Sequence, residues 1–228
     1  MKKFRYAFFA LIGSGSVFAQ TVPSVADVPF NQWSVEVMVG QNKPVRPFTE
    51  GYYLSNPQRY MFFSEISHVD IGGRYMLSEY FGFKADIGLD RFRSVSGSGS
   101  LPFDSKSWRI GLQGVANIGR VLKFESFSGR LGLLAHAGVF VSRFKSAGIH
   151  EDNGGWILGI TPQVRITDRL AVNMDLSALY SVRQHLTWDG KPADPTNNLT
   201  GTVSSLSVGA TWYLGKKNKH ADWYTIRK

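Results

Sequence analysis

The chain has 228 residues, of which 43% are hydrophobic and 14% aromatic, and it has no cysteine. This composition excludes an intrinsically disordered chain, and the missing cysteine excludes disulfide scaffolds, thiolate zinc sites and cysteine nucleophiles. The formal net charge of +9 would by itself favour a nucleic-acid partner. However, residues 1–19 carry +3 and residues 216–228 carry +4, which leaves only +2 for residues 20–215. We therefore predict no nucleic-acid partner.

Residues 1–19 have the three parts of a secretory signal peptide. A basic start with Lys2, Lys3 and Arg5 precedes a short apolar run, and Val17 and Ala19 stand at the −3 and −1 positions of a cleavage site. The apolar run is shorter than the ~20 residues that a membrane-spanning helix needs. We predict export, cleavage after Ala19, and a periplasmic segment at 20–30 before the main domain at 31–215.

The main domain alternates apolar and polar residues with a period of two, which is typical of β-strands with one apolar face. The clearest example is 81–90, where every second residue from Phe81 to Leu89 is apolar. The alternation has exceptions at Leu134 and Phe140, and Pro162 predicts a bulge or a local gap in its strand. Eight strands are predicted, at 33–40, 66–77, 81–90, 108–118, 131–142, 156–166, 170–180 and 205–214.

The connections between these strands alternate in length. Long connections are predicted at 41–65, 93–106, 143–155 and 181–203, short ones at 78–80 and 167–169, and an intermediate one at 119–129. Bacterial outer-membrane barrels have short periplasmic turns and longer extracellular loops. A secreted β-sandwich also has one apolar face and is the alternative. The asymmetry favours an all-β fold, an eight-stranded antiparallel up-and-down transmembrane β-barrel.

Aromatic residues fall near both ends of the predicted strands. Two girdles of aromatic rings are expected where a barrel meets the two membrane surfaces. With a periplasmic N-terminus, the periplasmic girdle comprises Trp33, Tyr75, Phe81 and Trp212, and the extracellular girdle comprises Phe92, Trp108, Trp156 and Tyr180.

The polar face of the strands carries nearly balanced charge, with glycines between the charged residues. An eight-stranded barrel has a narrow interior filled by side chains, and buried ions are tolerated there only when they are paired. We predict a lumen network of ion pairs that plugs the barrel, with a selective ion path as the alternative. The network comprises Glu36, His68, Asp70, Arg74, Lys84, Asp86, Asp90, Arg109, His136, Arg165 and Asp175.

Two segments carry a resemblance to a known group of proteins. Residues 207–224 (SVGATWYLGKKNKHADWY) and 175–185 (DLSALYSVRQH) resemble eight-stranded barrels of the OmpA/OmpX type, and more narrowly the N-terminal barrel of OmpA-like proteins from Bacteroidetes. The resemblance covers about 31–224 and implies a barrel in the outer membrane. In that group a similar exit leads into a peptidoglycan-binding domain. We expect no such domain before the end at Lys228, and predict a basic periplasmic tail at 216–228.

No residue pattern predicts a catalytic, cofactor-binding or metal site, and the histidines have no ligand spacing. A barrel enzyme that modifies lipid A would need a serine and a histidine, with or without an aspartate, near the outer leaflet. His136 and His185 are the candidates for that alternative. We predict that the chain is not an enzyme and has no cofactor.

The long loops offer the predicted contact surface, because binding surfaces use exposed aromatic rings and arginines. The alternative is a loop that folds over the rim and buries its own rings. We predict an outer-membrane structural or interaction protein that contacts lipid or lipopolysaccharide, and other outer-membrane proteins or extracellular ligands. A small porin-like channel is the alternative. The candidate loop contacts are Arg46, Tyr52, Tyr53, Arg59, Tyr60 and Trp188.

Overall fold

The computed structural model describes residues 29–52, 66–94, 97, 99–123, 129–193, 200–217 and 219–224. The predicted signal peptide and its cleavage site lie outside the described residues. Within the described ranges, no helix is both long and apolar enough to span a membrane.

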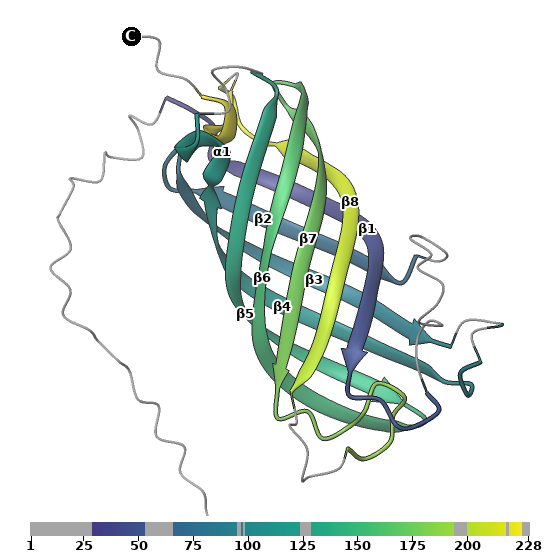
Figure 1. The fold of residues 1–228 in the computed structure, drawn as a ribbon. Coiled ribbons are helices and arrows are strands. Elements are labelled where there is room, and N and C mark those ends of the chain that lie inside the picture. The colour runs from purple at the N-terminus through teal and green to yellow at the C-terminus, as the bar shows by residue number, and fades with distance from the viewer. Residues whose placement is uncertain are drawn as a thin grey trace, which may run out of the picture.

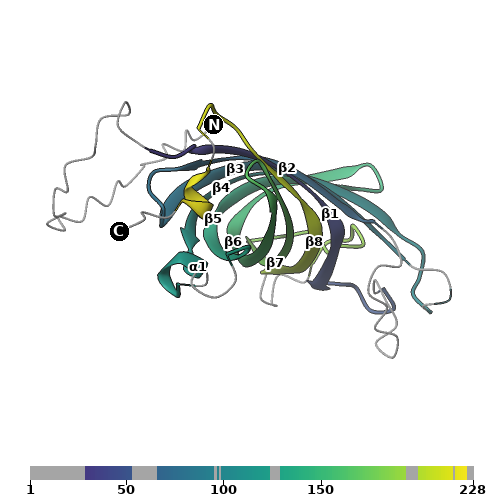
Figure 2. The same cartoon turned by 90° about the horizontal axis from the view of Figure 1, so that it is seen from above.

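The described residues form eight antiparallel strands that close into a barrel (Figure 1). Each strand pairs with its neighbours in the sequence, and β8 pairs with β1 to complete the ring, which Figure 2 shows from one end. The predicted eight-stranded fold is confirmed. The strands are β1 (Trp33–Arg46), β2 (His68–Met76), β3 (Phe81–Arg93), β4 (Asp104–Asn117), β5 (Leu131–Ser146), β6 (Ile149–Thr167), β7 (Leu170–Val182) and β8 (Gly201–Tyr213).

Successive side chains on each strand point to opposite sides of the wall. In β3, Leu89 is 57% exposed on the outer surface, whereas the next residue, Asp90, is 9% exposed and faces the lumen. The same alternation along the other strands gives the barrel an apolar outer surface and a mostly polar interior. The outer surface is therefore suited to lipid and the interior to hydrogen-bonded polar groups.

The two ends of the barrel differ. The connections 77–80 and 168–169 are short, and the third connection at this end contains helix α1 (Ile118–Val121). The opposite end carries the long connections 47–67, 94–103 and 183–200. In outer-membrane barrels the short turns face the periplasm and the long loops face outward, so we name the end with α1 the periplasmic end and the other the extracellular end.

The long loop predicted at 143–155 is wrong, because β5 and β6 continue through it to a two-residue turn at Ala147 and Gly148. Both turn residues have positive φ, 47° and 83°, as a type I′ hairpin requires. β5 and β6 have 16 and 19 residues, more than the ~9–11 that cross a bilayer. This hairpin therefore extends farther than a membrane-spanning strand needs, and its polar composition is what resembled a loop.

The predicted local gap at Pro162 is present between β6 and β7. Ile160 pairs with Leu176 and Gln163 with Asn173, and no pair is made at the two positions between them. The register is the same on both sides of this gap, and a register shift occurs farther along, between Arg165 and Thr167.

Candidate functional site

The middle of the lumen is filled by buried ion pairs centred on Arg109. Its guanidinium nitrogens lie 3.1 Å from Asp70 Oδ2, 3.4 Å from Asp90 Oδ2 and 3.9 Å from Asp86 Oδ1. His68 Nδ1 lies 2.7 Å from Asp90 Oδ1 on the other side of that carboxylate. All five side chains are buried, so each charge is compensated by partners inside the barrel and not by water.

Inward-facing glycines make room for this network. A Cβ atom at Gly88 would lie 2.6 Å from Arg109 Cζ, and one at Gly111 would lie 2.7 Å from Asp86 Oδ1. Real Cβ atoms do not approach other heavy atoms so closely. The glycines on the polar face are thus required by the size of the ion-pair network.

A second group of ion pairs continues toward the periplasmic end. Lys84 Nζ lies 3.0 Å from Glu36 Oε2 and 3.9 Å from Asp70 Oδ1, and Arg74 Nε donates to Glu36 Oε1 at 2.8 Å. Arg74 is fully buried. These contacts link β1, β2 and β3 across the lumen.

His136 and Asp175 form a third group, on β5 and β7. His136 Nε2 lies 2.9 Å from Asp175 Oδ2, and Nδ1 lies 2.6 Å from Gln113 Oε1. Ser177 donates to Asp175 and lies 3.5 Å from the same His136 Nε2. In a catalytic triad the serine and the aspartate bond to different ring nitrogens. Here both are on Nε2, so Ser177 lacks the arrangement of an activated nucleophile.

Arg165 does not join the predicted lumen network. Its Nη1 lies 3.6 Å from Asp168 in the following turn, its Nη2 donates to Gly129 O at 2.9 Å, and its guanidinium lies 5.6 Å from the Trp223 ring. The prediction placed it in the network because its strand phase is inward. It is wrong because Arg165 lies at the periplasmic rim, beyond the reach of the lumen carboxylates.

The periplasmic mouth is closed by residues 219–224, which belong to the segment predicted as a basic tail. Asp222 accepts hydrogen bonds from two guanidinium nitrogens of Arg74, each at 2.9 Å. Tyr213 Oη donates to the same carboxylate at 3.2 Å, and Gln163 Nε2 at 3.3 Å. Burial alone would raise the pKa of Asp222, but Arg74 and His220 hold it well below its usual range. The segment is thus anchored inside the barrel.

The neighbours of Asp222 fix the same segment to the barrel wall. His220 stacks on the Tyr213 ring with a centroid separation of 4.4 Å, and its Nε2 lies 3.2 Å from Gln32 O. Arg120 of α1 donates to the carbonyl oxygens of Ala221 and Tyr224. Figure 1 shows this C-terminal segment in yellow beside α1. The 3-10 turn η3 (Ala221–Trp223) therefore acts as a periplasmic plug, defined here as residues 219–224.

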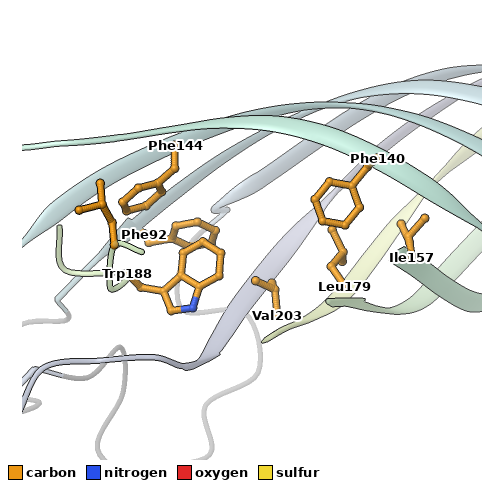
Figure 3. Packing of buried hydrophobic residues seen from close by; sticks show 8 residues of the cluster. Phe92, Phe140, Phe144, Ile157, Leu179, Trp188 and Val203 are labelled. Carbon is orange, nitrogen blue, oxygen red and sulfur yellow. The ribbon is translucent and has the colours of Figure 1, made fainter. Parts of the chain in front are cut away.

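The extracellular half of the lumen is closed by apolar side chains (Figure 3). Trp188, from the connection after β7, is 5% exposed, and its ring centroid lies 5.1 Å from that of Phe92 and 5.5 Å from that of Phe144. Trp188 Nε1 donates to Arg46 O at 2.7 Å. We name this group the extracellular plug; its buried members are Phe92, Phe140, Phe144, Ile157, Leu179, Leu186, Trp188 and Val203.

Two predictions are corrected by this plug. Phe92 is not a girdle residue, because it is 1% exposed and follows the outward-facing Arg91, which places it on the inward phase of β3. Trp188 is not an exposed loop contact, because its indole ring fills the mouth of the barrel. In both cases burial of a large aromatic surface outweighs the membrane or solvent position that the sequence suggested.

The other predicted loop contacts lie at the rim or outside the described residues. Arg46 is exposed at the end of β1. The centroid of the Tyr52 ring lies 6.3 Å from that of Phe103, and Lys191 Nζ lies 4.3 Å from the centroid of the Tyr52 ring. Tyr53, Arg59 and Tyr60 lie outside the described residues. His185, the other histidine of the enzyme alternative, lies 3.0 Å from Glu151 Oε1.

The remaining girdle residues face outward. Tyr75 is half-buried, with its ring centroid 4.8 Å from that of Trp33 on the neighbouring strand. The exposed rings near the periplasmic end belong to Trp33, Phe81 and Trp212, and those nearer the extracellular end to Trp108, Trp156 and Tyr180.

The space left at mid-lumen is small. A cavity of about 20 Å³ lies among Lys84, Arg109, His136 and Asp175. That is room for about one water molecule. Among the described side chains, no three His, Asp or Glu residues gather as a metal site.

No family model matches the chain, and no curated protein matches it. Solved outer-membrane structures are similar. Neisserial surface protein A is 13% identical with a TM-score of 0.47, covering 80% of this chain and 97% of its own. OprG of Pseudomonas aeruginosa is 11% identical with a TM-score of 0.46, covering 82% and 98%. A major outer membrane protein of Thermus thermophilus is 12% identical with a TM-score of 0.48, covering 80% and 99%.

At these identities the likeness concerns the barrel fold alone, which the closed strand register of this chain shows by itself. The narrower resemblance to OmpA-like proteins of Bacteroidetes stays a prediction.

Proposed function

We propose that the chain is an integral outer-membrane barrel with a closed lumen, which acts as a structural and interaction protein of the cell envelope. Its outer surface supports the membrane placement. The strands present an apolar band to the outside, with exposed aromatic rings toward both ends. A sheet within lipid must close on itself so that no backbone amide is left unpaired, and this sheet does so.

The observation that best supports a closed lumen is that side chains fill it at three levels. The periplasmic plug lies on Arg74, the ion pairs around Arg109 fill the middle, and the extracellular plug surrounds Trp188. The cavity of about 20 Å³ between these levels holds about one water molecule. Open aqueous channels are typical of barrels with ~16–18 strands. A closed barrel is therefore favoured over the porin-like alternative.

The enzyme alternative has less support. Among the described residues, Ser177 lies within 3.5 Å of His136, but both side chains are within the lumen, and the serine and the Asp175 carboxylate approach the same ring nitrogen. Lipid chemistry at the outer leaflet needs a nucleophile that a lipid can reach from the outer surface. We propose a non-enzymatic protein whose contacts are made by its outer surface, its extracellular loops and the β5–β6 hairpin.

The membrane placement is tested by fractionation of cells that express the chain, with gel migration measured before and after boiling. We expect the protein in the outer-membrane fraction and a shift in apparent mass on boiling, because a closed hydrogen-bonded barrel resists detergent until heated. Recovery in the soluble periplasmic fraction, with no shift on boiling, would contradict the proposal.

A further inference from the structure

A row of basic side chains crosses four neighbouring strands on the outer surface. The register places Arg91 opposite Lys106, Lys106 opposite Lys145, and Lys145 opposite His150. All four side chains are exposed. Like charges directly opposite each other destabilise a sheet, so such a row is costly unless an anion compensates it.

The carboxylates on this surface are held by arginines. Arg91 Nε donates to Asp104 Oδ1 at 2.9 Å, and the same guanidinium also reaches the second oxygen. Arg143 donates to both oxygens of Asp152, at 2.6 and 2.7 Å. Within the described residues, the salt bridges include none to Lys106 or Lys145. The excess positive charge of the row is therefore centred on these two lysines.

The height of the row matches the headgroup region of a membrane. The outward positions four residues closer to the barrel centre are Ile87, Ile110 and Val141, all apolar. At about 3.3 Å per residue, Lys145 lies roughly 13 Å along β5 from Val141. Leu89, Trp108 and Arg143 occupy the outward positions between the two rows. The basic row thus begins where the apolar band ends, on the extracellular side.

An apolar hollow lies below the row, on the far side of the layer that contains Trp108 and Arg143. Val141 and Val182 line this hollow, and Gly154 pairs with both at an outward position and has no side chain between them. The hollow has a volume of about 470 Å³ and is lined by Ile110, Leu112, Val139, Val141, Trp156 and Val182. Its lining is suited to a hydrocarbon chain.

We propose that the outer wall of β4–β7 binds one phosphorylated lipid of the outer leaflet, with its phosphate on Lys106 and Lys145 and an acyl chain in the hollow beside Gly154. Two separate features carry this inference: a pair of lysines without a salt bridge at headgroup height, and an apolar hollow beneath it on the same strands. Each lysine should add about as much binding free energy for a lipid phosphate as a lysine of a polybasic segment adds at an anionic membrane. The site depends on the proposed outer-membrane placement and is separate from the lumen.

The test uses the refolded full-length barrel in a non-ionic detergent, with binding measured by native mass spectrometry. The probes are diphosphoryl lipid A, the same lipid without phosphates, and inorganic phosphate alone. The variant Lys106→Gln/Lys145→Gln removes two charges from the row, and Lys216→Gln/Lys217→Gln removes two charges from exposed lysines at the other end of the barrel as a matched control. For each variant, a change in gel migration on boiling shows that the barrel is folded.

We expect Lys106→Gln/Lys145→Gln to weaken binding of diphosphoryl lipid A by about 30-fold, with little effect on the dephosphorylated lipid. The control variant should bind both lipids like the original chain. Equal binding of diphosphoryl lipid A by the two double variants would overturn the proposal.

The hollow is tested by Gly154→Leu. A Cβ atom at Gly154 would lie 3.7 Å from Phe140 O, an ordinary van der Waals contact, so a side chain fits without strain. The leucine should fill the hollow and weaken binding of both lipids. If Gly154→Leu has no effect and millimolar inorganic phosphate displaces the lipid completely, the site binds free phosphate and the lipid assignment is wrong.

Discussion

Asp222 and Arg74 form a bidentate ion pair across 148 residues of sequence, with both carboxylate oxygens 2.9 Å from guanidinium nitrogens. Neither side chain has contact with bulk water, since Arg74 is fully buried and the Asp222 side chain is buried as well. The pair joins a C-terminal segment to the inner wall of β2. It therefore closes the periplasmic mouth, and removing either charge leaves the other buried without its main partner.

The first prediction concerns this pair. Asp222→Asn should lower the free energy of unfolding by about 3 kcal/mol, because a buried arginine then loses a charged partner and keeps only Glu36. The measurement is urea unfolding of the barrel in phospholipid vesicles. Asp168→Asn is the matched control, because Asp168 is exposed in its pair with Arg165 and its loss should cost less than about 0.5 kcal/mol. Equal effects of the two variants would show that the plug is not anchored.

The pH dependence of the same pair has a definite sign. The pKa of Asp222 in the folded chain lies below its usual range, so its ionised form stabilises the folded state above the unfolded pKa of about 3.9. The difference in unfolding free energy between the original chain and Asp222→Asn should stay constant from pH 8 to 5. It should shrink as the pH falls below about 4. A transition of this difference between pH 5 and 7 would contradict the assignment.

The six tryptophans test the orientation of the side chains. Trp33, Trp108, Trp156 and Trp212 are exposed on the outer surface, whereas Trp188 and Trp223 are buried in the two plugs. In variants that keep one tryptophan each, brominated lipids should quench the fluorescence of the four outer rings. They should leave that of Trp188 and Trp223 nearly unchanged. Strong quenching of Trp188 would show that this ring lies outside the barrel.

The extracellular plug is tested through Trp188. Trp188→Ala should destabilise the barrel by about 3 kcal/mol, because it removes a buried ring from between Phe92 and Phe144. The connection after β7 should then be cut faster by trypsin after Arg183, whereas the Lys191–Pro192 bond is not a trypsin site. Trp156→Ala removes a ring of the same size from the outer surface and should leave this cleavage unchanged. Unaltered cleavage in Trp188→Ala would mean that the connection is held by other contacts.

Alternation predicted the strands and which of their residues face inward, because the two faces of a strand follow from the period of two, and the lengths of the connections then favoured a barrel over a sandwich. The inward positions of Asp86 and Asp90 follow directly from the outward positions of Phe83 and Leu89. The same rule, applied two residues beyond Asp90, places Phe92 inward, so its assignment to the girdle departed from the phase of its own strand.

The two plugs and the β5–β6 hairpin could not be predicted from the local sequence pattern. Phe140 and Leu179 interrupt the polar face, and only the assembled barrel shows that they meet in one apolar group with Trp188. Asp222 lies among basic residues in a segment with no strand pattern, and its role depends on Arg74, far away in the sequence. The β5–β6 hairpin was missed because residues 143–155 have no alternating apolar face, which was the pattern used to predict strands.

The closed lumen is tested most directly by single-channel recording of the refolded full-length chain in a planar lipid bilayer. With plugs at both mouths and ion pairs between them, the inserted barrel should give no steady channel currents. The folded state of the same preparation is verified by the change in gel migration on boiling. Steady, sizeable single-channel currents from the correctly folded chain would contradict the closed barrel and favour the porin-like alternative.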